Sequence, residues 1–140
     1  MTTTQKNISI LTISLVLATF IGLSWAAGAG DKINLMATPK HPDASGTALI
    51  NNDGINIQAQ GLKPDSVYTV WFVNMKPKKH EAGAGAPPYM FKTDASGAGT
   101  YSAPLGESPF GKWKMLMIVL HPNGDPKDMQ SMVGALSAKL

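Results

Sequence analysis

The 140-residue chain contains no cysteine and no arginine. Without cysteine the fold cannot be held by disulfide bonds and no lipid can be attached through a thiol, so stability must come from packing. Each of the twelve basic side chains is a lysine, and they form no single basic stripe. Proteins that read nucleic acids usually place arginine at base edges and aromatic side chains among clustered cations. The sequence therefore argues against nucleic acid as a partner.

The common catalytic motifs are also missing. The chain has no Gly-x-Ser-x-Gly elbow, no Walker loop and no His-Glu-x-x-His sequence. Glu81 and Glu107 are the only glutamates, and both lie in segments rich in glycine and proline, where nothing in their spacing indicates a catalytic pair. Ser96 is flanked by turn residues, which is typical of a turn hydroxyl rather than of a nucleophile. We therefore expect a protein that is not an enzyme.

Charge is absent from one long segment near the N-terminus. Residues 8–26 are apolar or small, Lys6 precedes them, and Ala27-Gly28-Ala29 fits a small-x-small cleavage pattern. These features are typical of a secretory signal peptide. A retained membrane anchor is the alternative, because about 20 apolar residues can span a bilayer. We predict a signal peptide over residues 1–29 and one exported domain over residues 30–140, located in the periplasm or outside the cell.

Two apolar runs dominate the exported domain. Residues 67–73 are all β-branched or aromatic, and such residues favour strands. Residues 113–120 form the second run, in which Lys114 is the only charged residue. Strands without a polar face are typically covered on both sides. We expect these two strands to lie side by side in the interior of a sheet.

Shorter segments complete the predicted fold. Residues 31–37, 45–50, 55–60, 89–93, 100–103 and 133–140 are predicted as strands, the last of them as an edge strand. The Asp53-Gly54 pair predicts a type I′ hairpin turn. Residues 75–88 predict a long surface loop, and Asp125-Pro126 is typical of the start of a short helical turn. About seven or eight short strands indicate an all-β fold, a single antiparallel β-sandwich of immunoglobulin-like type.

A Gly-Leu-x-Pro-x-x-x-Tyr-x-x-Trp pattern leads into the first apolar run and consists of Gly61, Leu62, Pro64, Tyr68 and Trp71. The segment from Phe91 to Gly99 follows it with Phe-Lys-Thr-Asp-Ala-Ser-Gly-Ala-Gly. This order resembles the extracytoplasmic β-sandwich domain of anti-sigma-K-type membrane proteins. The resemblance implies the sandwich alone. Members of that family carry a cytoplasmic sigma-binding segment before the membrane span, whereas seven residues precede the apolar segment here.

Histidine and methionine suggest one kind of site. Each of the three histidines has a methionine nearby in the sequence, and imidazole with thioether suits copper, Cu(I) especially. If the strands before two of these histidines end at the same pole of the sandwich, the rings converge there. The alternative is that the methionines fill the core and the histidines belong to turns. The candidate copper ligands are His41, Met75, His80, Met90 and His121.

A lysine cluster suggests another kind of site. Lys76, Lys78 and Lys79 lie in the predicted loop and could bind an anionic surface or a partner protein, although a solvated loop has the same composition. We therefore expect an exported, non-enzymatic binding or structural module without a cofactor. A periplasmic copper-binding protein is the alternative hypothesis. Contact with a membrane is expected only through the signal segment, if it stays uncleaved.

Overall fold

The computed structural model describes residues 30–140, so the predicted signal peptide lies outside the described residues. Residues 30–140 form nine strands and no helix, which confirms the all-β class. Within them no helix is available that could cross a membrane. The strands are β1 (Asp31–Ala37), β2 (Ser45–Ile50), β3 (Gly54–Gln60), β4 (Val67–Asn74), β5 (His80–Gly83), β6 (Met90–Lys92), β7 (Gly99–Pro104), β8 (Met115–His121) and β9 (Val133–Lys139).

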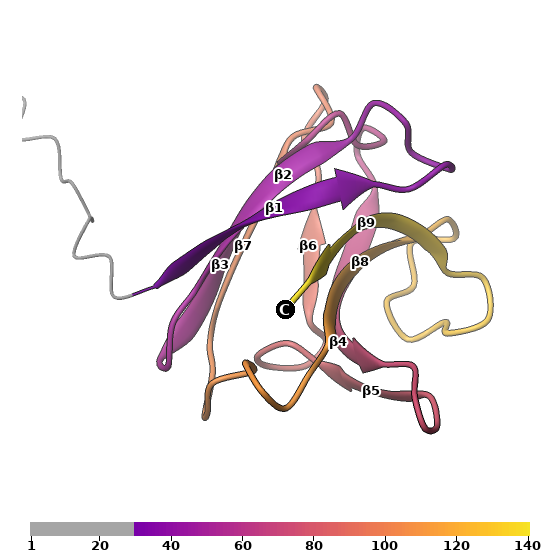
Figure 1. The fold of residues 1–140 in the computed structure, drawn as a ribbon. Coiled ribbons are helices and arrows are strands. Elements are labelled where there is room, and N and C mark those ends of the chain that lie inside the picture. Colours follow the sequence, from indigo (N-terminus) through magenta and orange to yellow (C-terminus); the bar gives the residue numbers. More distant parts are fainter. Residues whose placement is uncertain (1–29) are drawn as a thin grey trace, which may run out of the picture.

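All nine strands belong to one antiparallel sheet that curls into a half-barrel (Figure 1). Its order is β5-β4-β8-β9-β1-β2-β3-β7, and β6 pairs with β4 beside β5. One wall contains β2, β3 and β7, and the other contains β4, β8 and β9. Strand β1 joins the walls, because its first part pairs with β2 and its end pairs with β9. The core fills the space between them.

The two apolar runs are neighbours, as the sequence predicts. Strands β4 and β8 pair along their length from Val67↔His121 to Val73↔Met115. Tyr68 and Val70 of β4 face the core with 0% exposure, as do Leu116 and Ile118 of β8. Burying side chains of this size contributes about 1.5–3 kcal/mol each to folding. These two strands therefore form the centre of the core.

The other wall shows the alternation that a one-sided sheet requires. In β3, Ile55, Ile57 and Ala59 are buried, and the amides between them are exposed. A side-chain period of two places successive residues on opposite faces of a strand. The outer face of this wall is consequently polar, and the inner face packs against β4 and β8.

Two local predictions are wrong. No residue from Asn51 to Asp53 has a positive φ, so the β2–β3 connection is not a type I′ turn. Instead Asn51 Oδ1 accepts hydrogen bonds from the backbone N–H groups of Asp53 and Gly54, both at 2.8 Å. The Asp125 segment forms turns and bends rather than a helical turn. Its aspartates accept bonds from N–H groups two or three residues ahead, which supports turns as well as helix starts.

Two strands also have unexpected places. The predicted loop over residues 75–88 contains β5, which pairs with β4 from Trp71↔Gly83 to Asn74↔His80. Strand β9 is not an edge strand, because it lies between β8 and β1. The sheet ends at β5 and β7 instead. Whether a strand lies at an edge depends on its pairing partners, which are far apart in the sequence. A local sequence pattern does not indicate these partners.

Candidate functional site

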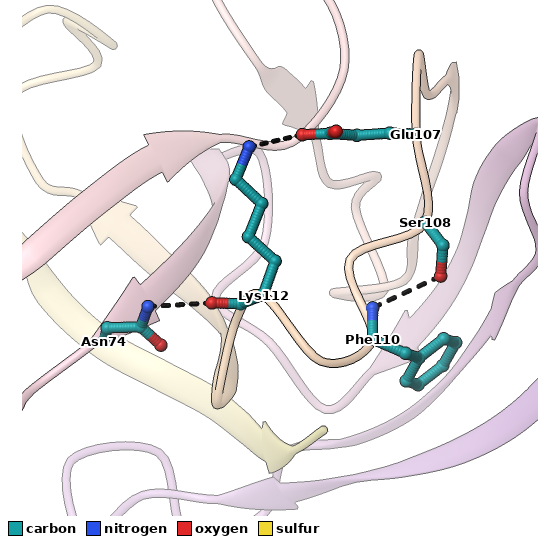
Figure 2. Close-up of polar contacts among 5 residues, drawn as sticks. All are labelled: Asn74, Glu107, Ser108, Phe110 and Lys112. Atoms are coloured by element: carbon teal, nitrogen blue, oxygen red, sulfur yellow. Dashed lines mark hydrogen bonds and ion pairs between the residues drawn. The ribbon is translucent and has the colours of Figure 1, made fainter.

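The β4–β5 hairpin and the β7–β8 connection meet at one end of the molecule, at the bottom of Figure 1. Asn74 joins them. Its side-chain amide donates a hydrogen bond to the Lys112 carbonyl at 2.9 Å, as Figure 2 shows, and its Oδ1 accepts one from the Lys114 N–H at 2.8 Å. These bonds hold the lysines of the β7–β8 connection beside the lysines of the hairpin.

Six exposed lysines gather at this end, which we call the basic end. Lys76, Lys78 and Lys79 come from the hairpin, as the sequence predicts. The structure adds Lys112 and Lys114, through Asn74, together with Lys139, which pairs with Met115 next to Lys114. The sequence could not indicate the last three as members of one cluster, because they come from different segments.

Two glutamates offset part of this charge. Glu81 lies 3.8 Å from the ammonium of Lys79, and Glu107 pairs with Lys112 (Figure 2). Three of these four side chains are exposed and Glu81 is half-buried, so each pair contributes about 0–1 kcal/mol to stability. Within residues 30–140 the other four lysines of the basic end have no ion-pair partner. The basic end therefore keeps a positive potential toward solvent.

Aromatic rings pack against one another at the basic end. The exposed ring of His80 lies against Trp113, with 5.2 Å between centroids. Trp113 is 7% exposed and stacks on Phe72 at 6.3 Å. The turn before it is held by the Phe110 N–H, which donates to Ser108 Oγ at 3.3 Å (Figure 2), and by the Trp113 N–H, which donates to the Pro109 carbonyl at 2.9 Å.

A pocket of about 200 Å³ opens beside these rings. Phe72 and Trp113 line it together with Leu105, Pro109 and Ala82. The Glu107–Lys112 ion pair stands at its rim, and the backbones of Gly83, Gly85 and Gly106 border the same space. The pocket thus combines apolar side chains with accessible backbone polar groups and lies inside the basic end. No feature of the sequence indicates it.

The histidines predicted as copper ligands do not converge. His80 pairs with Asn74 and His121 with Val67, so these two histidines lie at opposite ends of β4. Seven residue steps along a strand separate them by about 23 Å. The condition under which both rings would share one pole is not met, because β4 and β8 run antiparallel. One copper ion cannot be bound by both.

His121 is 2% exposed and is hydrogen bonded at both ring nitrogens. Its Nδ1 donates to the Asp128 carbonyl at 3.1 Å, and its Nε2 lies 2.6 Å from Thr69 Oγ1. The same hydroxyl accepts a bond from Trp71 Nε1 at 2.7 Å. His121 therefore anchors the β8–β9 connection to the outer face of β4, and both of its ligating atoms are engaged.

The remaining predicted ligands lie in separate places. His41 Nε2 is 3.2 Å from the Tyr68 hydroxyl, which accepts a bond from the Lys63 N–H at 2.9 Å. Met90 pairs with Thr69 through β6. Met75 is 56% exposed on the same hairpin as His80. Residues 30–140 contain no cluster of three His, Asp or Glu side chains at ligand spacing. Copper binding stays a hypothesis that a Cu(I) titration would test.

A wider groove of about 680 Å³ lies on the polar wall, over β2, β3 and β7. Its side chains include Thr47, Gln58, Gln60 and Thr100. Asp94 at its border already accepts bonds from Ser96 and Ala98, and these bonds lower the pKa of its carboxyl. Lys92 also lines the groove, so its neutral hydrogen-bonding groups lie beside one positive and one negative side chain, and no excess of positive charge gathers there as it does at the basic end.

Comparison of the chain with protein-family models, curated proteins and solved structures finds no match.

Proposed function

We propose that the protein is an exported, non-enzymatic binding module and that its basic end binds an anionic partner. The observation that carries this proposal is the gathering of lysines from three segments around a pocket and an exposed histidine. Complementary charge raises the association rate and rejects partners of the wrong sign. The other parts of the proposal are an immunoglobulin-like sandwich, supported by the two facing walls, and export, supported by the apolar segment at residues 8–26.

The distribution of charge along the strands supports the basic end as the binding site. Seven of the eleven lysines after residue 29 lie toward the end where β4 stops and β8 begins, and six of these form the basic end. Five of the nine acidic residues lie at the other end of the strands, in the connections that contain Asp43, Asp65, Asp94, Asp125 and Asp128. The seven lysines near the basic end therefore face only four acidic residues there, Asp31, Asp53, Glu81 and Glu107. An anionic partner would consequently approach with the basic end first.

A pair of triple variants tests the proposal. In the first, Lys76, Lys78 and Lys79 become glutamine. In the second, the exposed lysines Lys40, Lys92 and Lys127, which lie outside the basic end, become glutamine, so both variants have the same net charge. We expect the first variant to bind surface-immobilised polyglutamate at least about tenfold more weakly than the unmodified protein at low salt, and the second to change about twofold or less.

The readout is the equilibrium binding constant as a function of salt concentration. The unmodified protein and the second variant should show the same steep loss of binding with salt, and the first variant a shallow one. Equal losses in the two variants would contradict the proposal, because net charge alone would then explain the binding.

A further inference from the structure

Strand β5 presents a free edge at the basic end. It terminates the strand order of the sheet and pairs only with β4. The Ala84 N–H donates to the Val70 carbonyl at 3.0 Å, and Trp71 is opposite Gly83. In this antiparallel pattern the N–H and C=O groups of Gly83 and Glu81 point away from β4. No hydrogen bond of residues 30–140 engages these groups.

The pocket of about 200 Å³ lies along the same strand, because Ala82 and Gly83 of β5 belong to its lining. A dry cavity of about 150 Å³ can hold a benzene molecule, so the pocket has room for one aromatic or large aliphatic side chain. Phe72 and Trp113 offer stacked aromatic rings as its walls. A side chain inserted from a segment paired with β5 would reach these rings.

The charges around the pocket indicate which residues such a segment would carry on either side of the inserted side chain. Lys78 is exposed next to β5 and has no ion-pair partner within residues 30–140. Lys79 and Lys112 are also exposed there, and Glu81 and Glu107 neutralise them only in part because both pairs face solvent. Acidic residues on either side of an inserted apolar residue would meet these lysines. Strand addition gives affinity through the main chain, and pockets for single side chains give specificity.

We propose that the anionic partner is an extended acidic peptide segment that adds to the free edge of β5 and places one apolar side chain in the pocket. This inference rests on the function proposed above and names the partner class. An anionic membrane would use the lysines but neither the edge nor the small pocket. The edge and the pocket therefore favour a peptide over a lipid surface.

Three synthetic peptides test the inference by equilibrium binding to the protein. The first is a nine-residue peptide of glutamate and threonine with one central phenylalanine. The second has serine in place of the phenylalanine, and the third is the first with alternate backbone nitrogens methylated. We expect the phenylalanine peptide to bind at least about tenfold more tightly than either of the others, because the second cannot fill the pocket and the third cannot pair with the edge.

A pocket-filling variant makes the test specific. Gly106 borders the pocket and has no positive φ, and a Cβ at this position would have no heavy atom within 4 Å. Gly106→Trp therefore adds bulk at the border of the pocket from a Cβ that meets no neighbour. It should abolish the preference for phenylalanine over serine. Asn56→Trp, on the exposed face of β3, is the matched control and should keep the preference. Thermal unfolding confirms that both variants fold.

The outcomes separate the two proposals. Equal binding of the three peptides, or tighter binding to vesicles of anionic lipid than to the phenylalanine peptide, would overturn the inference and leave the proposed function standing. Tight binding of the phenylalanine peptide by the Lys76, Lys78 and Lys79 glutamine variant would instead overturn the proposed function, because the lysines would then have no part in recognition.

Discussion

His121 and His41 differ in how many of their ring nitrogens are hydrogen bonded. His121 engages both ring nitrogens, with Thr69 on one side and the Asp128 carbonyl on the other. His41 engages only Nε2, through Tyr68, and its buried Nδ1 has no hydrogen-bond partner within residues 30–140. Both histidines precede proline in the sequence, and only their tertiary neighbours distinguish them.

The environment of His41 predicts a pH dependence of stability. Burial lowers the pKa of its ring below the ordinary value of 6.5, although the nearby carbonyl of Gly134 partly opposes this shift. The folded state therefore binds a proton less readily than the unfolded state, and the free energy of unfolding falls as the pH drops below 6.5. At higher pH this contribution is fully present.

We expect the melting temperature to fall between pH 7.5 and pH 5.5 by a smaller amount in His41→Gln than in the unmodified protein. Glutamine can still bond to the Tyr68 hydroxyl but does not titrate. Differential scanning calorimetry at several pH values provides the measurement. Parallel pH curves for the two proteins would show that the burial of His41 has no effect on stability.

At the scale of elements, the connections are specified by a few residues. The β6–β7 turn depends on Asp94, whose Oδ1 accepts bonds from Ser96 and Ala98, and on Gly97. Gly97 has a φ of 82° and lies so close to the segment after β3 that a Cβ would be 2.1 Å from the Leu62 carbonyl oxygen. Its N–H donates to the Asp94 carbonyl at 3.1 Å. This position therefore requires glycine.

Gly97→Ala should lower the free energy of unfolding by about 2–4 kcal/mol, because it adds both backbone strain and a clash with a main-chain atom. Gly106→Ala is the matched control, since Gly106 has open space around it and no positive φ. That control should stay within about 0.5 kcal/mol of the unmodified protein. Urea denaturation measures both, and equal values would refute the role assigned to Gly97.

At the scale of the whole molecule, β9 is the strand through which the β4–β8 wall reaches β1. It pairs with β8 on one side and with the end of β1 on the other. Leu136 of β9 is 0% exposed and belongs to the core. The strand predicted to be an edge is thus paired on both sides, and without it β1 would have no partner in the β4–β8 wall.

Leu136→Asp should abolish cooperative folding, because an unpaired charge buried in the core costs several kcal/mol, a large part of the stability of a small domain. Ser137→Asp, one residue along and partly exposed, should be tolerated. Near-ultraviolet circular dichroism and urea denaturation distinguish the two. A Leu136→Asp protein with an unchanged unfolding transition would show that the core does not depend on β9.

Much of the fold could be predicted from local pattern. The bounds of β1 and β2 agree with the predicted residues, and β3 begins one residue earlier. β-branched and aromatic runs favour strands wherever they occur, so residues 67–73 and 113–120 indicated the centre of the sheet without an alignment. β5 was missed because a strand of four residues next to prolines and glycines has too short a pattern to recognise.

The sequence by itself determined the all-β class and the lysine cluster at residues 76–79, because each depends on side chains that are neighbours in the chain. It also indicated the pairing of the two apolar strands, because both lack a polar face and must be covered. Only the tertiary structure decided that Lys112, Lys114 and Lys139 join that cluster, that a pocket opens beside β5, and that His80 and His121 lie far apart. These depend on the direction in which β4 and β8 pair and on which strands become edges. Contacts between distant segments fix both properties, and no local pattern encodes them.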